Sequence, residues 1–429
     1  MEARDRVGGR VENFHLSNGG VTELGAAFVG PTQDHVLDLA KDLGLETFLE
    51  HNEGQNEAFL NGQRLTYSAS DALPQLDAET TTQIVTAVGG LDGLASSIDP
   101  HAPWSHPNAT ELDGTTFATW INSTVTSETV RELLGITSGA VWSATPEELS
   151  LLYVLAYIAG AGNETATGNL ERLIGVTGGA QASRIVGGTG LLATGLASKI
   201  GWHNIHLNSP VKSIVRSHNG SYTVTSSSGK IAAKSVIVAM SPPLAARITY
   251  SPLLPAKRDQ LTQRYFMGAL GKATAIYSEP SWRAANISGQ VLSSTGNVRT
   301  TFDVSPANAS YGAILGFLEA DEMRALDPLS EAEIIAKVQE DYVQYFGPEA
   351  ANATQWVIKR WDNEEWSRGG PVALAGPGTL TRYGTALREV VGGIHWAGTE
   401  TSPYWTGYMD GALRSGERAA EEILAGESR

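Results

Sequence analysis

Residues 392–426 read "GGIHWAGTETSPYWTGYMDGALRSGERAAEEILAG". The apolar run Ile394–Ala397 predicts a short strand, and the Gly-Thr-Glu sequence after it predicts a turn. A helix is expected to begin near Gly407 or Tyr408. A helix N-terminus presents free N–H groups and a partial positive charge, which favour an anionic ligand. This stretch therefore predicts a strand, a turn and a helix that together hold an anionic group.

The first ten residues, "MEARDRVGGR", look like part of a nucleotide-binding motif. In a dinucleotide-binding βαβ unit, the acidic residue that ends the second strand binds the ribose hydroxyls. Glu2 fits that position, and Arg4 and Arg10 are expected to reach the phosphates. Gly8 and Gly9 let the backbone pass close to them. A surface turn with scattered charge is the alternative interpretation of the same ten residues.

Together the two stretches resemble the flavin monoamine oxidase family. Further similar segments follow in the family's order: "LGAAFVGPTQ", "RIVGGTGLL", "SPVKSI", "SPPLAARITYSPLLP", "GKATAIY", "RWDNEEWSRGGPV" and "GPGTLTRYGTALREVVG". The resemblance covers essentially all 429 residues. It implies an FAD-dependent oxidation of a primary amine by O2, which yields an aldehyde, ammonia and hydrogen peroxide. The expected partners are therefore a small-molecule amine and O2.

The segment pattern predicts an α/β fold in which two domains are interleaved. Residues 1–47, 187–261 and 364–429 alternate between strand and helix, and we assign them to a Rossmann-like FAD-binding domain. Residues 48–186 and 262–363 are assigned to an α+β substrate-binding domain. The run "SVIVAM" is expected to be a strand covered on both faces. Ser330 and Glu333 predict a capping box for a helix that Gly347 ends.

The resemblance also implies roles for individual residues. Lys272 matches the lysine that holds a water near flavin N5, where a desolvated ammonium would favour electron transfer to oxygen. Tyr408 matches one wall of an aromatic cage that excludes water around the amine. An exposed strand lysine and a core tyrosine are the alternative interpretations. The implied FAD-binding residues are Glu2, Arg4, Gly9, Arg10, Gly25, Ala26, Phe28, Val211, Trp361, Gly398, Thr399 and Met409.

Two further residues are expected at the substrate. Gln181 is predicted to face the substrate cavity, and Val372 falls at the second wall of the cage. Because that wall is a large aromatic in well-known family members, Trp361, Trp366 or Trp405 is the expected compensation. Some members link the flavin to a cysteine where this chain has Pro371. The chain contains no cysteine, so FAD is expected to be bound non-covalently.

The chain departs from the family at its start. The family begins with a strand and a G-x-G-x-x-G turn about 30 residues before the acidic residue. That pattern occurs nowhere in this sequence. We therefore expect a truncated gene model or a fragment, incomplete at the N-terminal side of its FAD-binding domain. A flavin-free remnant is the alternative from outside the enzymes. An L-amino-acid oxidase, which needs an arginine at the substrate carboxylate, and a polyamine oxidase, which needs acidic residues, are the alternatives on the same fold.

Composition limits the partners and the location. The net charge of −16 argues against nucleic acid as a partner. No apolar run is long enough for a spanning helix, so no membrane anchor is expected, and the histidines predict no metal site. A homodimer is a further hypothesis. An excess of N-x-S/T sequons predicts a glycoprotein of the secretory pathway, with a cytoplasmic protein as the alternative. The sequon asparagines are Asn108, Asn122, Asn163, Asn219, Asn286, Asn308 and Asn352.

Overall fold

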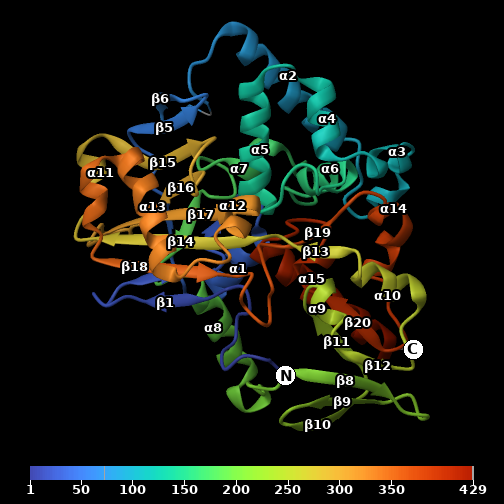
Figure 1. The fold of residues 1–429 in the computed structure, drawn as a ribbon. Helices are drawn as coiled ribbons and strands as arrows, with labels where there is room; N and C mark the ends of the chain where they lie inside the picture. Colours follow the sequence, from blue (N-terminus) through green and yellow to red (C-terminus); the bar gives the residue numbers. More distant parts are fainter. Residues whose placement is uncertain (72, 428–429) are drawn as a thin grey trace.

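The computed structural model describes residues 1–71 and 73–427 (Figure 1). Residue 72 of the predicted piece 48–186 and residues 428–429 of the piece 364–429 lie outside the described residues. Figure 1 shows helices and a large sheet in the upper part of the molecule, and a smaller layer of strands at the bottom. Within the described residues, no helix is both long and apolar enough to cross a membrane.

A seven-stranded sheet forms the centre of the upper part. Strands β15 and β5 run parallel, and the other neighbouring strands run antiparallel. In spatial order the strands are β18 (Gln355–Arg360), β14 (Leu270–Tyr277), β17 (Gly312–Glu319), β16 (Thr300–Asp303), β15 (Ile287–Ser293), β5 (Gln55–Leu60) and β6 (Gln63–Ser68).

The register of this sheet aligns side chains that are far apart in sequence. Lys272 pairs with Phe317, Phe317 pairs with Thr300, and Thr300 pairs with Leu292. Directly opposed residues of neighbouring strands point to the same face of a sheet. The four side chains therefore form a row on one face.

Helices α5, α11, α12 and α13 pack against this sheet. The helices of the sequence piece 48–186 are α2 (Ala78–Ala95), α3 (Ala109–Gly114), α4 (Phe117–Thr124), α5 (Glu128–Trp142), α6 (Leu151–Ala159) and α7 (Leu170–Ile174). Those of the piece 262–363 are α11 (Ser281–Ala284), α12 (Ala320–Ala325) and α13 (Glu331–Phe346). The predicted capping box of Ser330 and Glu333 starts α13, and Gly347 follows its last residue, so that expectation is confirmed.

The remaining helices belong to the other pieces. They are α1 (Asp34–Asp42), α8 (Gly190–Ile200), α9 (Pro242–Ala245), α10 (Ala256–Thr262), α14 (Thr379–Tyr383) and α15 (Met409–Glu427). The lower layer consists of β8 (Val211–Arg216), β9 (Tyr222–Ser226), β10 (Gly229–Ala233) and β12 (Thr249–Ser251). The parallel pair is β11 (Val236–Ala239) with β20 (Ile394–Ala397).

Small sheets join distant segments of the chain. The antiparallel sheet β3-β7-β4 brings the sequence piece 1–47 against the end of the piece 48–186. In a second small sheet, β13 pairs with β19. The bounds are β1 (Asn13–His15), β2 (Val21–Glu23), β3 (Phe28–Val29), β4 (Thr47–Leu49), β7 (Ser183–Ile185), β13 (Tyr265–Met267) and β19 (Ala373–Ala375).

One expectation about β11 is wrong. The apolar run "SVIVAM" does form a strand, but Ile237 is 40% exposed and Ala239 is exposed as well. Among the described residues β11 pairs with β20 alone, and its residues border a large cavity. A strand that borders a cavity has no neighbour to cover that side.

Candidate active site

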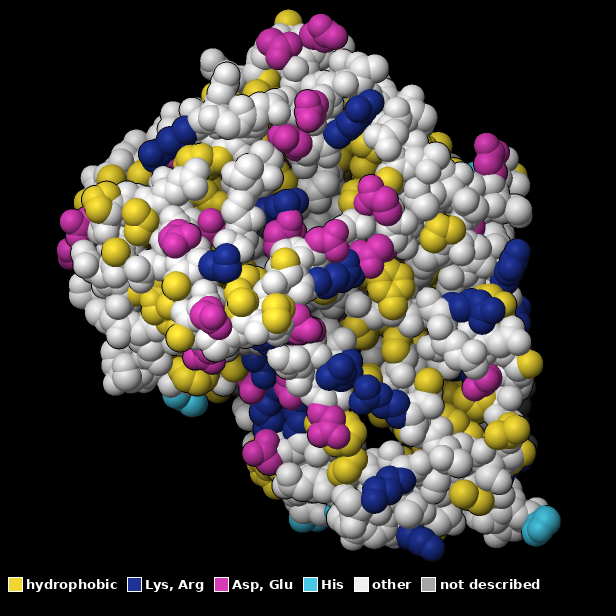
Figure 2. All heavy atoms as spheres, viewed as in Figure 1, with side chains coloured by type: hydrophobic (Ala, Val, Ile, Leu, Met, Phe, Trp, Pro, Cys, Tyr) yellow, Lys and Arg dark blue, Asp and Glu magenta, His cyan; other side chains and the backbone are white. Residues whose placement is uncertain are grey.

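A cavity of about 1350 Å³ lies between the seven-stranded sheet and the parallel pair β11-β20. All five sequence pieces contribute residues to its wall. Figure 2 shows the surface hollowed between β8 and the α9-β11 segment, with Lys and Arg side chains along the rim. The volume exceeds the usual range of about 300–1,000 Å³ for small-ligand sites. The cavity is therefore large enough for an extended cofactor and a substrate together.

The structure brings nearly all the sequence-predicted site residues to this one cavity. Val372 is the exception, because it is fully buried in the main hydrophobic core. The residues that line the cavity are Glu2, Arg4, Gly9, Arg10, Gly25, Ala26, Phe28, Gln181, Val211, Lys272, Trp361, Gly398, Thr399, Tyr408 and Met409. We call the part lined by Glu2, Gly9, Val211 and Met409 the nucleotide end.

Arginines at the nucleotide end are held by carboxylates and backbone. Arg4 donates to Ser367 Oγ over 2.7 Å and lies 3.4 Å from a Glu364 oxygen. Arg10 pairs with both oxygens of Glu400 at 2.8 and 3.1 Å, and also donates to the Pro371 carbonyl. Burial alone would lower the pKa of Arg10, but the Glu400 carboxylate raises it above its ordinary value. Both arginines are therefore held in fixed positions beside the cavity.

Two glycines shape the wall next to Arg10. A Cβ on Gly25 would lie 1.9 Å from the Arg10 carbonyl oxygen, so the two segments can pack only because Gly25 has no side chain. Gly9 has φ +57°, and a Cβ there would meet no protein atom within 4 Å. The open side of Gly9 belongs to the cavity wall, which leaves the backbone free to approach a ligand. Exposed backbone, fixed cations and a helix start are the groups that fit a dinucleotide such as FAD.

The predicted helix start lies at this cavity. Helix α15 begins at Met409, and Thr399 fixes the turn before it. The Thr399 hydroxyl oxygen accepts the Gly407 N–H at 2.7 Å, and it lies 2.9 Å from the Tyr408 carbonyl oxygen, to which it can donate. Met409, the first residue of α15, lines the cavity together with Gly398 and Thr399, so the start of this helix lies at the cavity wall.

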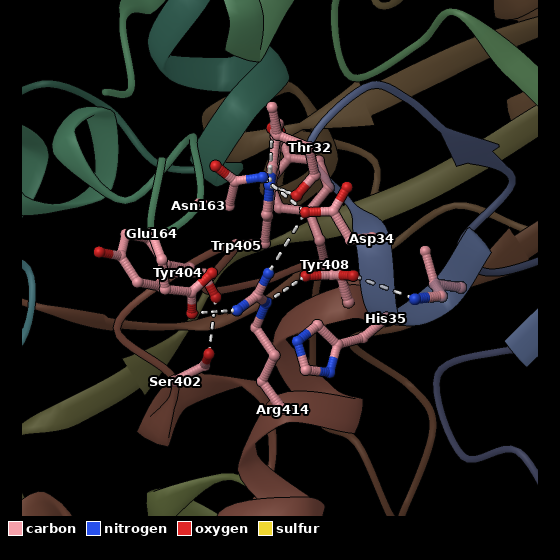
Figure 3. Close-up of polar contacts among 12 residues, drawn as sticks. Thr32, Asp34, His35, Asn163, Glu164, Ser402, Tyr404, Trp405, Tyr408 and Arg414 are labelled. Atoms are coloured by element: carbon pink, nitrogen blue, oxygen red, sulfur yellow. Dashed lines mark hydrogen bonds and ion pairs between the residues drawn. The ribbon is translucent and has the colours of Figure 1, made fainter. Parts of the chain in front are cut away.

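Arg414 ties the start of α15 to the rest of the molecule (Figure 3). Its Nε donates to Asp410 over 2.6 Å, and a terminal nitrogen donates to Glu164 over 2.7 Å. Asp410 in turn accepts the backbone N–H of Val36 on α1, and Trp405 Nε1 donates to the Thr32 carbonyl. Because three segments are fastened together here, Tyr408 and Met409 have a fixed position at the cavity wall.

Lys272 is buried, with 4% of its surface exposed, and faces the cavity. Its Nζ donates to the Gly25 carbonyl over 2.6 Å and lies 3.4 Å from the Glu23 carbonyl oxygen. It also lies 5.6 Å from the centre of the Phe317 ring. Burial lowers the pKa of Lys272 to about 8. The alternative of an exposed strand lysine is therefore wrong.

Aromatic side chains surround Tyr408. The Trp405 ring packs edge-on against it, 4.8 Å between centres, and the Tyr157 ring lies 6.3 Å away. Tyr157 lines the cavity, and a Cβ on Gly407 would lie near both Tyr157 and Val372. The expectation that Val372 forms a cage wall is corrected here, because Val372 packs behind these groups in the core. Trp361 and Trp366 line the cavity, whereas Trp405 is buried behind Tyr408.

The other part of the cavity is apolar, and we call it the amine end. Its wall comes from α2, α5, α7 and the row on the sheet face, and the side chains include Ile84, Val88, Leu133, Leu134, Ile136, Leu173, Leu292 and Phe317. The charged side chains that line it, within the described residues, are Lys272, Asp71, Asp92 and Glu171. In the part of the chain that the structure describes, three buried polar atoms there have no hydrogen-bond partner: Gln181 Oε1, Ser143 Oγ and Thr300 Oγ1.

The sequence interpretation missed most of the amine end, and Tyr157 and Thr300 with it. Apolar residues at helical spacing on α2 and α5 look like ordinary core positions, and nothing in their pattern marks a cavity. Thr300 reaches the site through strand register with Lys272, which the sequence does not reveal. Tyr157 lies in the apolar helix α6, and nothing in the sequence around it indicates that it borders a cavity.

Known proteins resemble this chain over nearly its whole length. The family model for flavin-containing amine oxidoreductases matches residues 1–424. AofH of Mycobacterium tuberculosis, named as a flavin-containing monoamine oxidase, is 38% identical over 425 residues, which cover 99% of this chain and 90% of the relative. The cyclohexylamine oxidase of Brevibacterium oxydans superimposes with a TM-score of 0.94 at 32% identity, over 100% of this chain and 93% of that one.

A putrescine oxidase solved with bound putrescine is also similar, with a TM-score of 0.93 at 29% identity, over 99% of this chain and 92% of that one. These likenesses confirm the predicted α/β FAD-binding fold and FAD as the cofactor. This chain belongs to the family of flavin-containing amine oxidoreductases, and by that membership it is an FAD-dependent amine oxidase.

Proposed function

We propose that the substrate is a primary amine with an apolar substituent, which occupies the amine end. The single observation that carries the proposal is the continuity of one cavity from the nucleotide end, past Lys272 and Tyr408, into an apolar compartment. Apolar walls favour an apolar substituent because burial removes its surface from water. The acidic side chains Asp71, Asp92 and Glu171 favour the approach of an alkylammonium ion.

The nucleotide end would hold FAD. Glu2 would bind the ribose, Arg4 and Arg10 the phosphate side, and the start of α15 the negative charge of the cofactor. Gly9 and Gly25 leave backbone accessible to it. The remaining proposed cofactor contacts are Ala26, Phe28, Val211, Trp361, Gly398, Thr399 and Met409. When bound, FAD supplies the acceptor for the hydride equivalent of the amine α-carbon and passes the electrons to O2.

Lys272 and Tyr408 would be the catalytic residues that lie beside the reacting atoms. The Lys272 amine, fixed by the Gly25 carbonyl, would hold a water at the cavity wall and stabilise negative charge that develops on oxygen. Tyr408 would pack against the amine and exclude water, with Tyr157 close beside it. Gln181, whose Oε1 has no partner among the residues that the structure describes, would accept a hydrogen bond from the substrate amine.

The charges of the amine end weigh against one alternative. An L-amino-acid oxidase needs a cation for the substrate carboxylate, and none of the described residues lining the amine end is an arginine. A diamine would be held by an acidic group, and that observation keeps a polyamine as the second candidate. Asp92 is engaged by the Leu170 N–H at 2.8 Å, so Asp71 and Glu171 would have to serve a second ammonium.

The visible absorption spectrum of the purified chain, followed by an amine panel with peroxide detection, tests the proposal. We expect an oxidised-flavin spectrum and faster turnover of cyclohexylamine and benzylamine than of putrescine or L-leucine. A colourless protein that stays colourless after incubation with FAD would contradict FAD binding by this chain. Faster turnover of L-leucine or putrescine would overturn the proposed substrate class.

Three further expectations stay proposals: the division into two domains, a homodimer and N-glycosylation. The division into an FAD-binding and a substrate-binding domain follows the five sequence pieces, and a homodimer is tested by light scattering of the purified chain. We also propose N-glycosylation in the secretory pathway. The sequon asparagines are exposed apart from Asn163, which is half-buried and donates to Asp34. A mass decrease on treatment with an amidase specific for N-glycans would support this, and an unchanged mass of the natively produced protein would overturn it.

A further inference from the structure

A buried ion network lies behind Lys272, and the proposed function does not use it. It consists of Glu23 at the end of β2, Arg184 on β7 and Glu50 after β4. Their side chains are at most 5% exposed. Arg184 Nε donates to Glu50 over 2.6 Å, and another nitrogen of Arg184 lies 3.7 Å from the Glu23 carboxylate. Buried ion pairs contribute little net stability, because desolvation offsets their attraction, so another role should be sought for them.

Glu23 touches Lys272 and Arg184 through different atoms. Its backbone carbonyl oxygen lies 3.4 Å from Lys272 Nζ, while its carboxylate faces Arg184. Gly25, two residues after Glu23, accepts the shorter hydrogen bond from Lys272 Nζ through its carbonyl oxygen. The position of β2 therefore sets the position of the Lys272 amine, and Arg184 fixes the side chain at the end of β2.

The number of N–H donors on Lys272 Nζ depends on its protonation state, which decides how it can interact with a group in the cavity. An ammonium has three N–H donors, whereas a neutral amine has two donors and one lone pair. The carbonyls of Gly25 and Glu23 can accept two hydrogens in either state. The third position of the Lys272 nitrogen remains for a group in the cavity, and it is a donor in the charged state and an acceptor in the neutral state.

We propose, on the basis of the proposed function of Lys272, that Glu23 and Arg184 are positioning residues that hold the Lys272 amine at the cavity wall and decide whether it carries a proton there. Glu23 favours the charged amine, and Arg184 opposes it. Glu50 neutralises Arg184 and so limits that opposition.

The electrostatics agree with this geometry. Burial is the main cause that lowers the pKa of Lys272 to about 8, the Glu23 carboxylate raises it, and Arg184 lowers it further. Burial raises the pKa of Glu50 to about 7 despite Arg184. The other charged and titratable groups around Lys272 and this network are Glu12, His51, Arg283, Asp303, Tyr311, Lys359 and Glu364.

The protonation midpoint of Lys272 can be measured without the cofactor. Acetic anhydride modifies neutral amines, and Lys272 lines the cavity, so the pH dependence of its acetylation in the flavin-free protein reports the midpoint by peptide mass spectrometry. For Glu23→Gln we expect a lower midpoint by at least one pH unit, which increases the acetylated fraction at pH 7 about fivefold. The double variant Arg184→Gln/Glu50→Gln removes the Arg184 charge together with its buried carboxyl partner. It should raise the midpoint and reduce acetylation at pH 7 up to about tenfold.

A matched control is available on β5. Glu57 is a buried carboxylate paired with Arg64, and it does not line the cavity. Glu57→Gln should leave the Lys272 midpoint unchanged. Opposite shifts in Glu23→Gln and in the double variant support the proposal, because general loosening of the fold would move both in one direction. Equal midpoints in all variants, or shifts of the same sign, overturn it.

A second readout separates this inference from the proposed function. In the holoenzyme, the pH profile of the oxygen half-reaction should move with the acetylation midpoint in each variant. If Lys272→Met leaves the oxygen half-reaction unchanged, the proposed role of Lys272 in catalysis fails. The acetylation midpoints would still decide whether Glu23 and Arg184 control its protonation.

Discussion

The nucleotide end and the amine end share one cavity, yet different kinds of chemical group line them. The nucleotide end exposes backbone at Gly9 and Gly25, fixed arginines and a helix start. The amine end exposes apolar side chains from α2, α5, α7 and the central sheet. The first needs particular residues at particular positions, because only glycine lets the segments approach. The second needs only an apolar surface of suitable shape, which many sequences supply.

Gly25→Ala should have the largest effect, because its Cβ would collide with the Arg10 carbonyl. We expect a loss of about 3 kcal/mol in the free energy of unfolding and loss of flavin binding. Urea denaturation and a flavin titration measure both. Gly93→Ala on α2 is the control, since a Cβ there meets nothing within 4 Å. It should gain about 0.5–1 kcal/mol from helix propensity. If Gly25→Ala and Gly93→Ala were equally stable, the wall of the nucleotide end would not require a glycine at position 25.

Lys272→Met should slow the oxygen half-reaction about a hundredfold, the effect of removing one preorganised charge from a reacting centre. In the unsubstituted enzyme the rate should fall as pH rises through about 8, because the charged amine is lost there. Stopped-flow absorbance over pH 6–10 measures both. The control is Lys359→Met: Lys359 is directly opposite Lys272 on β18, pairs with Glu12 and does not line the cavity. A similar loss in that control would contradict a specific role.

Glu319→Gln tests a buried acid behind the amine end. Burial raises the pKa of Glu319 to about 8, and its Oε1 has no hydrogen-bond partner among the described residues. The folded state therefore binds more protons than the unfolded state between pH 4.5 and 8, so the stability that Glu319 contributes at low pH is lost as pH rises through this window. Relative to the parent chain, the free energy of unfolding of Glu319→Gln should increase by about 3 kcal/mol between pH 4 and pH 7.

Urea denaturation at the two pH values measures this gain. Exposed Glu331→Gln on α13 is the control and should show no such dependence on pH. The same pH dependence in both variants, or none in either, would contradict a buried neutral carboxyl at position 319.

The smallest effect is expected from neighbouring threonines of β16. Thr300 Oγ1 faces the amine end and has no partner within residues 1–71 and 73–427, whereas Thr301 Oγ1 donates to the Gly289 carbonyl over 2.8 Å. Thr300→Val should leave stability unchanged or slightly increased, and Thr301→Val should cost about 1 kcal/mol. Thermal denaturation compares the two. A larger loss in Thr300→Val would mean that its hydroxyl has a partner within the protein.

The difference between the two ends also explains which predictions could be made from sequence. Glu2, Arg10 and the segment around Met409 were predicted because their motifs combine glycine, charge and a helix start. Val372 was misplaced because alignment to an aromatic position says nothing about which side of its segment faces the cavity. Tyr157 and Thr300 carried no motif and were missed.

The sequence by itself determined the family, the cofactor and several elements such as β20 and α13, because glycine positions, caps and hydrophobic periodicity act locally. Only the tertiary structure decided which apolar faces enclose the amine end, since an exposed cavity wall and a packed core have the same composition. It alone placed Glu23 and Arg184 behind Lys272. Residues from β2, β7 and β14 meet there through sheet register and chain crossing, and those long-range contacts have no signature in a single stretch of sequence.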